Sequence, residues 1–152
     1  MTNHDRLLFK KYVTTLDQKH LTFLKDHNFR NPYRSMRYPG FEEIASWAGR
    51  PEKEFTDPEI NEYFLNLKKS VEAFVEQESI SVAPYTDGAD PFFAVCGLEG
   101  DPWTPPKDAV EAAELLNSLT TKAYEASVDF ERAVLKIYDV SRDHLGDLGS
   151  VS

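Results

Sequence analysis

An apolar stripe in the C-terminal third of the chain constrains the fold more than any other sequence feature. Because an α-helix has about 3.6 residues per turn, apolar residues that recur at alternating spacings of three and four lie on one face of a helix. The pattern predicts one long helix over residues 108–144, beginning after Pro105-Pro106 and ending before Gly146. The stripe consists of Ala109, Ala112, Leu116, Leu119, Ala123, Ala126, Phe130, Ala133, Ile137 and Val140.

A second long helix is predicted over residues 56–79. Thr56 and Glu59 have the spacing of a capping box at its start. Two apolar stripes joined by a connection pack most simply as an antiparallel pair, so the predicted fold is mainly α, in a single domain. The second stripe consists of Ile60, Phe64, Leu67, Val71 and Phe74.

The remaining parts of the chain have weaker patterns. Residues 1–50 contain three short apolar patterns, around residues 7–16, 20–29 and 41–47, and we expect short helices packed alongside the long pair. Residues 145–152 are predicted to form a flexible tail.

The connection over residues 80–107 is unusually long for a compact domain, which favours a functional or structured segment. It is too apolar for a solvated linker, and the segments that flank TDGAD permit a small β-hairpin, although Pro84 and Pro91 count against full strands. Its aromatic residues are candidate interaction residues, because aromatic side chains are frequent interface anchors. The alternative is that they cover the core. These candidates are Tyr85, Phe92, Phe93 and Trp103.

Charge is distributed unevenly along the chain. The formal net charge is −9, but residues 1–38 contain eight basic and three acidic side chains, so the acidic excess lies in the rest of the sequence. Arg30, Arg34 and Arg37 are candidate anion-binding residues, since guanidinium groups bind phosphates and carboxylates well. The alternative is pairing with carboxylates of the same chain. The overall acidity argues against duplex nucleic acid as a partner.

No motif predicts catalysis or cofactor binding. The sequence has neither a P-loop nor a GxGxxG fingerprint, and it has no Glu-x-x-His pair. Asp17 and His20 have a spacing that could chelate a metal, but capping or exposed roles are favoured, so we predict no metal, no cofactor and no catalytic residue. The single cysteine, Cys96, is predicted to be a small buried apolar residue.

Three phrases occur in the order FLKDHNF, RPEKEFTDPEI and LNSLTTKAYEASVDFERAVLKI. In this order, with a short helix ending near Trp47 and an aromatic, proline-bearing loop, the chain resembles a family of uncharacterised bacterial helical proteins over roughly residues 6–140. The resemblance implies a helical fold and a bacterial, cytosolic setting. It implies no activity, and it transfers no catalytic residue.

These features favour a non-enzymatic protein–protein interaction module. Two alternatives stay open: an acidic inhibitor, such as an immunity protein or nucleic-acid mimic, and an enzyme whose site is assembled from residues far apart in sequence. The wide apolar face of the last helix also leaves self-association open. The apolar stretches are too short to cross a bilayer and the N-terminus has no signal-peptide pattern, so we expect a cytoplasmic protein.

Overall fold

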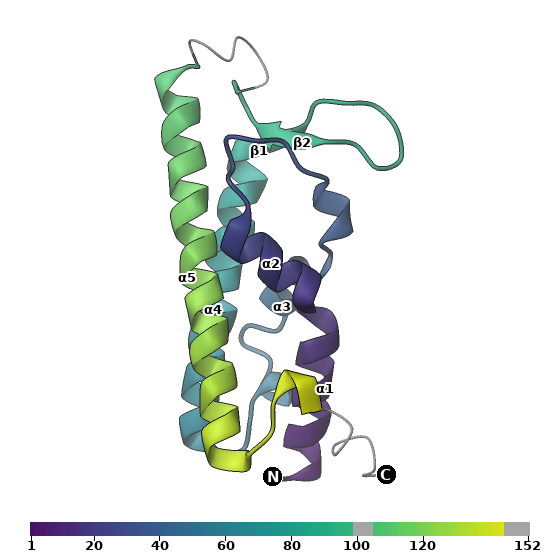
Figure 1. Ribbon diagram of the computed structural model, residues 1–152, viewed down its shortest axis with the longest axis vertical. Helices are drawn as coiled ribbons and strands as arrows, with labels where there is room; N and C mark the ends of the chain where they lie inside the picture. Colours follow the sequence, from purple (N-terminus) through teal and green to yellow (C-terminus); the bar gives the residue numbers. More distant parts are fainter. Residues whose placement is uncertain (99–104, 145–152) are drawn as a thin grey trace.

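The structure, a computed structural model, describes residues 1–98 and 105–144, and it confirms a mainly helical fold (Figure 1). Short 3-10 turns at Ser35–Arg37, Pro51–Lys53 and Arg142–His144 lie between or after the main elements. The elements are, in chain order, α1 (Asn3–Thr15), α2 (Gln18–Asp26), α3 (Gly40–Ser46), α4 (Pro58–Ser81), β1 (Val82–Pro84), β2 (Phe93–Val95) and α5 (Lys107–Tyr138).

The two long helices, α4 and α5, pack against each other, as their apolar stripes predicted. In Figure 1 the chain rises along α4 and descends along α5. Glu59, near the start of α4, lines the same surface depression as Lys136, near the end of α5. Small residues in α5, among them the fully buried Ala113 and Ala123, provide room for the close approach of the two helices.

The start of α4 differs in detail from the prediction. The expected capping box of Thr56 and Glu59 is wrong, because the N-cap is Asp57, whose carboxylate accepts a hydrogen bond of 3.0 Å from the backbone N–H of Ile60. The Thr56 hydroxyl donates instead to the buried carboxylate of Asp5 in α1, at 2.7 Å. Thr56 therefore joins the beginning of α4 to α1.

Helix α5 ends at Tyr138, before the predicted limit at residue 144. Asp139 has a left-handed conformation, with φ of 54°, and its N–H donates to the carbonyl of Leu135 at 2.9 Å. Aspartate tolerates this conformation better than most residues, so it can terminate a helix. The chain then turns back, and the Arg142 guanidinium binds both carboxylate oxygens of Glu131 in α5, at 3.0 and 3.1 Å.

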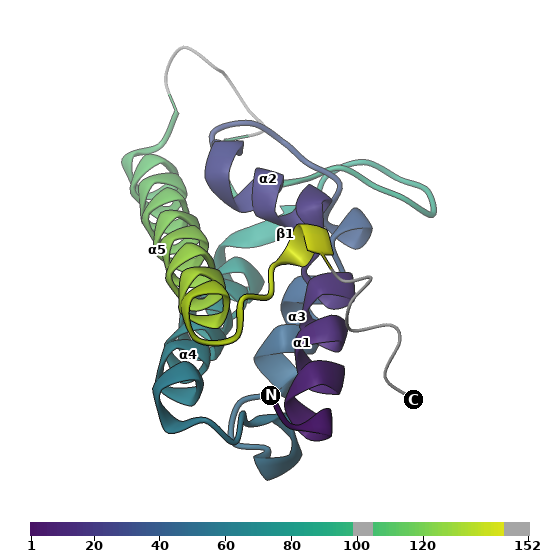
Figure 2. The same cartoon turned by 60° about the horizontal axis from the view of Figure 1, so that its bottom comes forward.

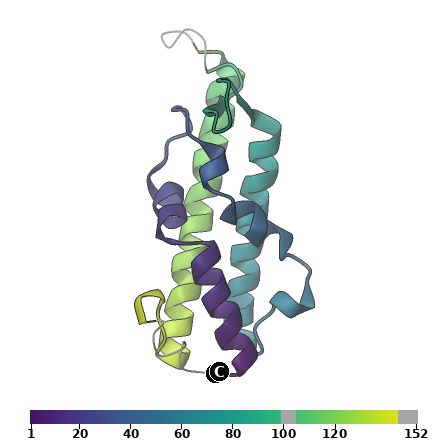
Figure 3. The ribbon, with the colours of Figure 1, turned by 90° about the vertical axis from the view of Figure 1, so that its right-hand side faces the viewer.

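The three short helices α1, α2 and α3 lie alongside the long pair (Figures 2 and 3). Their apolar side chains close one core with α4 and α5. At the level of α1, the ring of Tyr12 meets the rings of Phe64 and Phe130 edge to face, with centroids 6.1 and 4.9 Å apart. The N-terminal region thus covers the long helices.

The predicted β-hairpin is confirmed, with short strands. β1 and β2 pair antiparallel in the register Val82↔Val95, Ala83↔Ala94 and Pro84↔Phe93. Each strand is three residues long, and one further hydrogen bond, of 3.0 Å from the backbone N–H of Tyr85 to the carbonyl of Phe92, continues the pairing beyond Pro84. The hairpin follows α4 directly and projects sideways from the end of the helix pair (Figure 1).

Two predictions, for Trp103 and for the tail at residues 145–152, lie outside the described residues. Among the helices of residues 1–98 and 105–144, none combines the length and apolar character needed to cross a membrane.

Candidate binding site at the hairpin end

The structure brings the predicted arginine segment and the predicted aromatic loop together. Tyr33 and Phe93 exchange two backbone hydrogen bonds, of 3.0 and 2.6 Å, so the chain at Tyr33 lies against the free edge of β2. We call this region the hairpin end and define it as residues 33–38 and 78–95. Two segments about fifty residues apart in sequence therefore form one surface.

Two of the three predicted anion-binding arginines face the hairpin. The Nε atom of Arg37 lies 3.0 Å from Oδ2 of Asp90, and the Nε atom of Arg34 lies 3.9 Å from the same oxygen. The Arg34 guanidinium also lies over the ring of Phe92, 4.5 Å from its centroid. Arg30 makes neither of these contacts, and its side chain is exposed. Pairing within the chain thus uses Arg34 and Arg37, and anion binding stays a prediction.

The predicted aromatic residues divide into two groups. Tyr85 is 45% exposed and directly follows β1, whereas Phe92 and Phe93 are half-buried. Phe93 packs against the core, so at this position the ring covers the core. Met36 was not singled out in the sequence, yet it is 62% exposed on the neighbouring 3-10 turn. The most exposed large apolar side chains of the hairpin end are therefore Ile80, at 76%, Met36 and Tyr85.

A cavity of about 420 Å³ opens beside this surface, between α2, α3, α4, β2 and the Ser35–Arg37 turn. Its volume falls within the range of small-molecule sites, about 300–1,000 Å³. Five aromatic rings line it, and its charged lining residues are Glu42 and Glu78. The rings are those of Phe23, Tyr33, Tyr38, Phe41 and Phe93.

Glu78 is the lining residue with the most perturbed chemistry. Its carboxylate accepts a hydrogen bond from the hydroxyl of Tyr33. Burial raises the pKa of the Glu78 carboxyl; the Tyr33 hydrogen bond acts against this shift, and the charge of Glu42 adds to it. Burial and the nearby Glu78 charge also raise the pKa of Tyr33. Glu78 is therefore a half-buried acid held by one tyrosine.

Sequence reasoning missed Glu78, although a signal was present. The α4 stripe reaches Phe74, and the next position at the same alternation is residue 78, followed by the buried Ser81. A glutamate at the end of an apolar stripe is unusual, because an unpaired carboxylate is costly to bury. Such a position marks either a buried ion pair or a site.

His20 is held by two hydrogen bonds and has no nitrogen left for a metal. Its Nδ1 lies 2.8 Å from the Asp17 carboxylate, and its Nε2 accepts a hydrogen bond of 2.9 Å from the backbone N–H of Gly40. Asp17 also caps α2, and its pKa is lowered, since hydrogen bonds from His20 outweigh the effect of burial, which would raise it. Within residues 1–98 and 105–144, no group of three or more His, Cys, Asp or Glu side chains could hold a metal.

Cys96 is exposed, so its prediction as a buried residue is wrong. It directly follows Val95, which is 1% exposed. Successive side chains along an extended strand point to opposite faces, and Val95 takes the inward position. The thiol consequently faces outward at the end of β2.

No protein-family model, no curated protein and no solved structure matches the chain. The resemblance to bacterial helical proteins therefore stays a prediction.

Proposed function

We propose that the chain is a non-enzymatic protein-binding module and that it binds a partner protein through the hairpin end. The observation that carries the proposal is the joining of the arginine segment to the aromatic hairpin, by the backbone bonds of Tyr33 with Phe93 and by the stacking of Arg34 on Phe92. Arginine, tyrosine and other aromatic residues are the side chains most enriched among interface anchors.

Preorganisation also supports this surface. Asp90 holds Arg37 and approaches Arg34, and Arg34 in turn packs on Phe92, so these long side chains are already ordered before a partner arrives. Ordering a rotamer-rich side chain on binding costs about 0.5–1.5 kcal/mol, and a surface ordered in advance avoids part of this cost. The exposed ring of Tyr85 and the thioether of Met36 supply apolar area beside the charged groups.

The proposed setting is the bacterial cytoplasm, which rests on the sequence resemblance. The acidic-inhibitor alternative differs in its physical basis, because it relies on long-range attraction to a basic target. Binding that weakens steeply with salt would favour it, whereas binding through the hairpin end should depend weakly on salt.

The test is affinity capture from a lysate of the native host with three versions of the full chain. We expect the wild type to retain a partner that the double variant Tyr85→Ser/Met36→Ser loses. Leu7→Ser is the matched control, since Leu7 is an apolar residue of similar exposure, 57%, on α1 near the opposite end of the molecule (Figure 1). Circular dichroism should show unchanged helicity in all three. Retention of the same proteins by the wild type and the double variant would overturn the proposed surface.

A further inference from the structure

We propose that the cavity beside the hairpin binds an organic cation, namely a guanidinium or alkylammonium group. The cation is either a free small molecule or the side chain of a partner protein. Only the second source rests on the proposed function.

The first argument is charge. The cavity is lined by the carboxylates of Glu42 and Glu78, and none of its lining residues is Lys, Arg or His. In the part of the chain that the structure describes, neither glutamate lies within 4.0 Å of a basic nitrogen. A half-buried carboxylate without a nearby cation is unfavourable, and a bound cation would relieve this cost.

The second argument is the aromatic lining, which selects the kind of cation. The ring centroids of Phe23 and Tyr38 lie 4.3 Å apart, and that of Phe41 lies 5.7 Å from Phe23 and 6.1 Å from Tyr38. Aromatic faces attract weakly hydrated cations such as guanidinium and alkylated ammonium groups. Hard metal ions instead need several oxygen ligands, and the two carboxylates supply too few.

The third argument is that one of these rings already attracts a cation of the chain itself. Nζ of Lys19 lies 5.7 Å from the centroid of the Tyr38 ring. Lys19 lines the neighbouring depression, which also includes Tyr38, and it does not line the cavity. Lys19 therefore leaves the cavity carboxylates, Glu42 and Glu78, available for a second cation.

The test titrates the full chain with methylguanidinium and with tetramethylammonium, followed by amide NMR shifts. We expect saturable binding of at least one cation, with the largest shifts in residues 33–42 and 75–82. Glu78→Gln should weaken this binding at least about tenfold, because it removes the charge while its amide oxygen still accepts the Tyr33 hydrogen bond. Glu76→Gln is the matched control, since Glu76 is exposed on the same helix and does not line the cavity.

A second variant keeps the test decisive if Glu78→Gln is unstable. Glu42→Gln should also weaken cation binding, and its side chain is exposed enough to be changed without affecting the core. The inference fails if neither cation saturates the wild type, or if the folded Glu78 or Glu42 variants bind as well as the wild type does.

A third arm of the experiment distinguishes a free cation from a cationic side chain of the partner, and it tests this inference separately from the proposed function. If Glu78→Gln also loses the partner retained in the capture experiment, the cation is a side chain of that partner. If the variant keeps the partner but loses methylguanidinium or tetramethylammonium, the site binds a free cation. Partner capture without any cation binding would overturn this inference and leave the proposed function standing.

Discussion

Gly40 occupies a position where no other side chain fits. A β-carbon at this residue would lie 2.0 Å from the carbonyl oxygen of Thr15 and 2.7 Å from Nε2 of His20. The backbone N–H of Gly40 donates to that same nitrogen, so the close approach is part of the hydrogen bond. The glycine thereby lets α3 start directly against the end of α1 and the first turn of α2.

Gly40→Ala should therefore lower the free energy of unfolding by about 2–4 kcal/mol, because Thr15 and His20 must both move. Gly49→Ala is the comparison, since Gly49 has a φ of 76° but no atom within 4 Å of its added carbon. Only backbone strain should follow there, about 1 kcal/mol. Urea denaturation measures both, and equal effects would contradict the steric argument.

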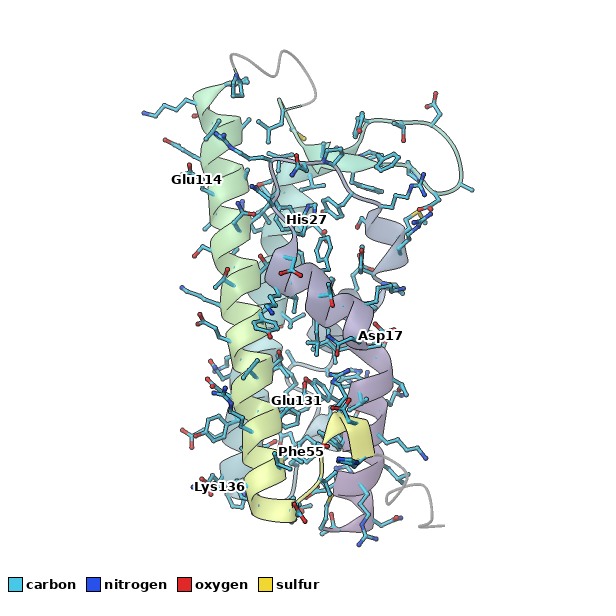
Figure 4. All side chains as sticks on the ribbon, viewed as in Figure 1. Asp17, His27, Phe55, Glu114, Glu131 and Lys136 are labelled. Atoms are coloured by element: carbon cyan, nitrogen blue, oxygen red, sulfur yellow. The ribbon has the colours of Figure 1, made fainter. Side chains whose placement is uncertain are left out.

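His27 ties the stability of the fold to pH. Its ring stacks on Phe23 at 4.6 Å between centroids, below the hairpin (Figure 4), and its Nε2 is buried without a hydrogen-bond partner among the described residues. Burial lowers the pKa of His27 to about 4, although a hydrogen bond with the backbone of Asn31 acts in the opposite direction. In the unfolded chain a histidine titrates near its ordinary pKa of about 6.5.

Between pH 6.5 and pH 4, His27 is protonated more readily in the unfolded chain than in the folded protein. The contribution of His27 to the free energy of unfolding is therefore fully present above about pH 6.5 and is lost as the pH falls toward 4. The loss from this residue should be at most about 3.5 kcal/mol. His27→Phe keeps the stacking and should flatten this part of the pH–stability curve measured by urea denaturation. The exposed His144, changed to Gln, should leave the curve unaltered. A curve for His27→Phe as steep as that of the wild type would refute the assignment.

The burial of individual residues was predicted well where the buried residues are apolar. All five members of the α4 stripe are fully buried. In α5, however, Thr120 is buried next to the predicted Leu119, which is only half-buried, and Ser127 is buried beside the predicted and buried Ala126. Their hydroxyls donate to carbonyls of the preceding turn, at 3.1 and 2.6 Å, so a polar residue can be buried without an unpaired group. A hydrophobic pattern cannot detect this compensation.

At the scale of elements, the segment after α5 is fastened by one ionic contact. Arg142 binds Glu131, which is labelled in Figure 4, with two nitrogens, and the Tyr12 hydroxyl of α1 donates to the same carboxylate at 2.6 Å. The Arg142 guanidinium also lies 5.5 Å from the centroid of the Tyr12 ring. Three segments distant in sequence thus meet at one glutamate.

Arg142→Ala should lower the free energy of unfolding by about 1.5–3 kcal/mol, since the partly buried Glu131 loses a charge-assisted bidentate contact. Arg142→Lys should recover only part of the loss, because an ammonium cannot reproduce the two parallel bonds. Arg132→Ala is the control, as Arg132 is exposed on α5, and its effect should stay within about 0.5 kcal/mol. Thermal unfolding measures all three; an Arg142→Ala protein as stable as the control would show the contact to be unimportant.

The sequence predicted which elements form and where the hairpin lies, because both depend on local periodicity and turn residues. It did not predict the bridge between Tyr33 and Phe93, since backbone pairing carries no side-chain signature and joins distant segments. For the same reason the cavity was not predicted, because its walls come from several elements. It became visible only when Phe23, Phe41 and Glu78 were placed together.

At the scale of the whole molecule, protection against exchange should follow the distribution of the core. Residues 64–74 of α4 include Phe64, Leu67, Val71 and Phe74, all fully buried, whereas most side chains of the loop between β1 and β2 are exposed. Hydrogen–deuterium exchange should therefore be slowest in the middle of α4 and in the facing part of α5, and fast between residues 84 and 92. Equal protection of this loop and of α4 would contradict the expectation that protection follows the buried core.

Self-association through α5 stays a prediction. The exposed large apolar residues of this helix are Leu115 and Leu135, and a separation of twenty residues corresponds to about 30 Å along the axis. A second copy would have to span most of the helix to cover both.

The aromatic residues form two separate groups along the helix pair. One group joins Tyr12, Phe64 and Phe130, and the other joins Phe23, Phe41 and Phe74. On α4, aliphatic Leu67 and Val71 lie between the two levels. The molecule therefore has two packing regions, one around Tyr12, Phe64 and Phe130 and one beside the hairpin. Protein engineers should be able to exchange the hairpin for a different recognition loop while the first region keeps the helix pair folded.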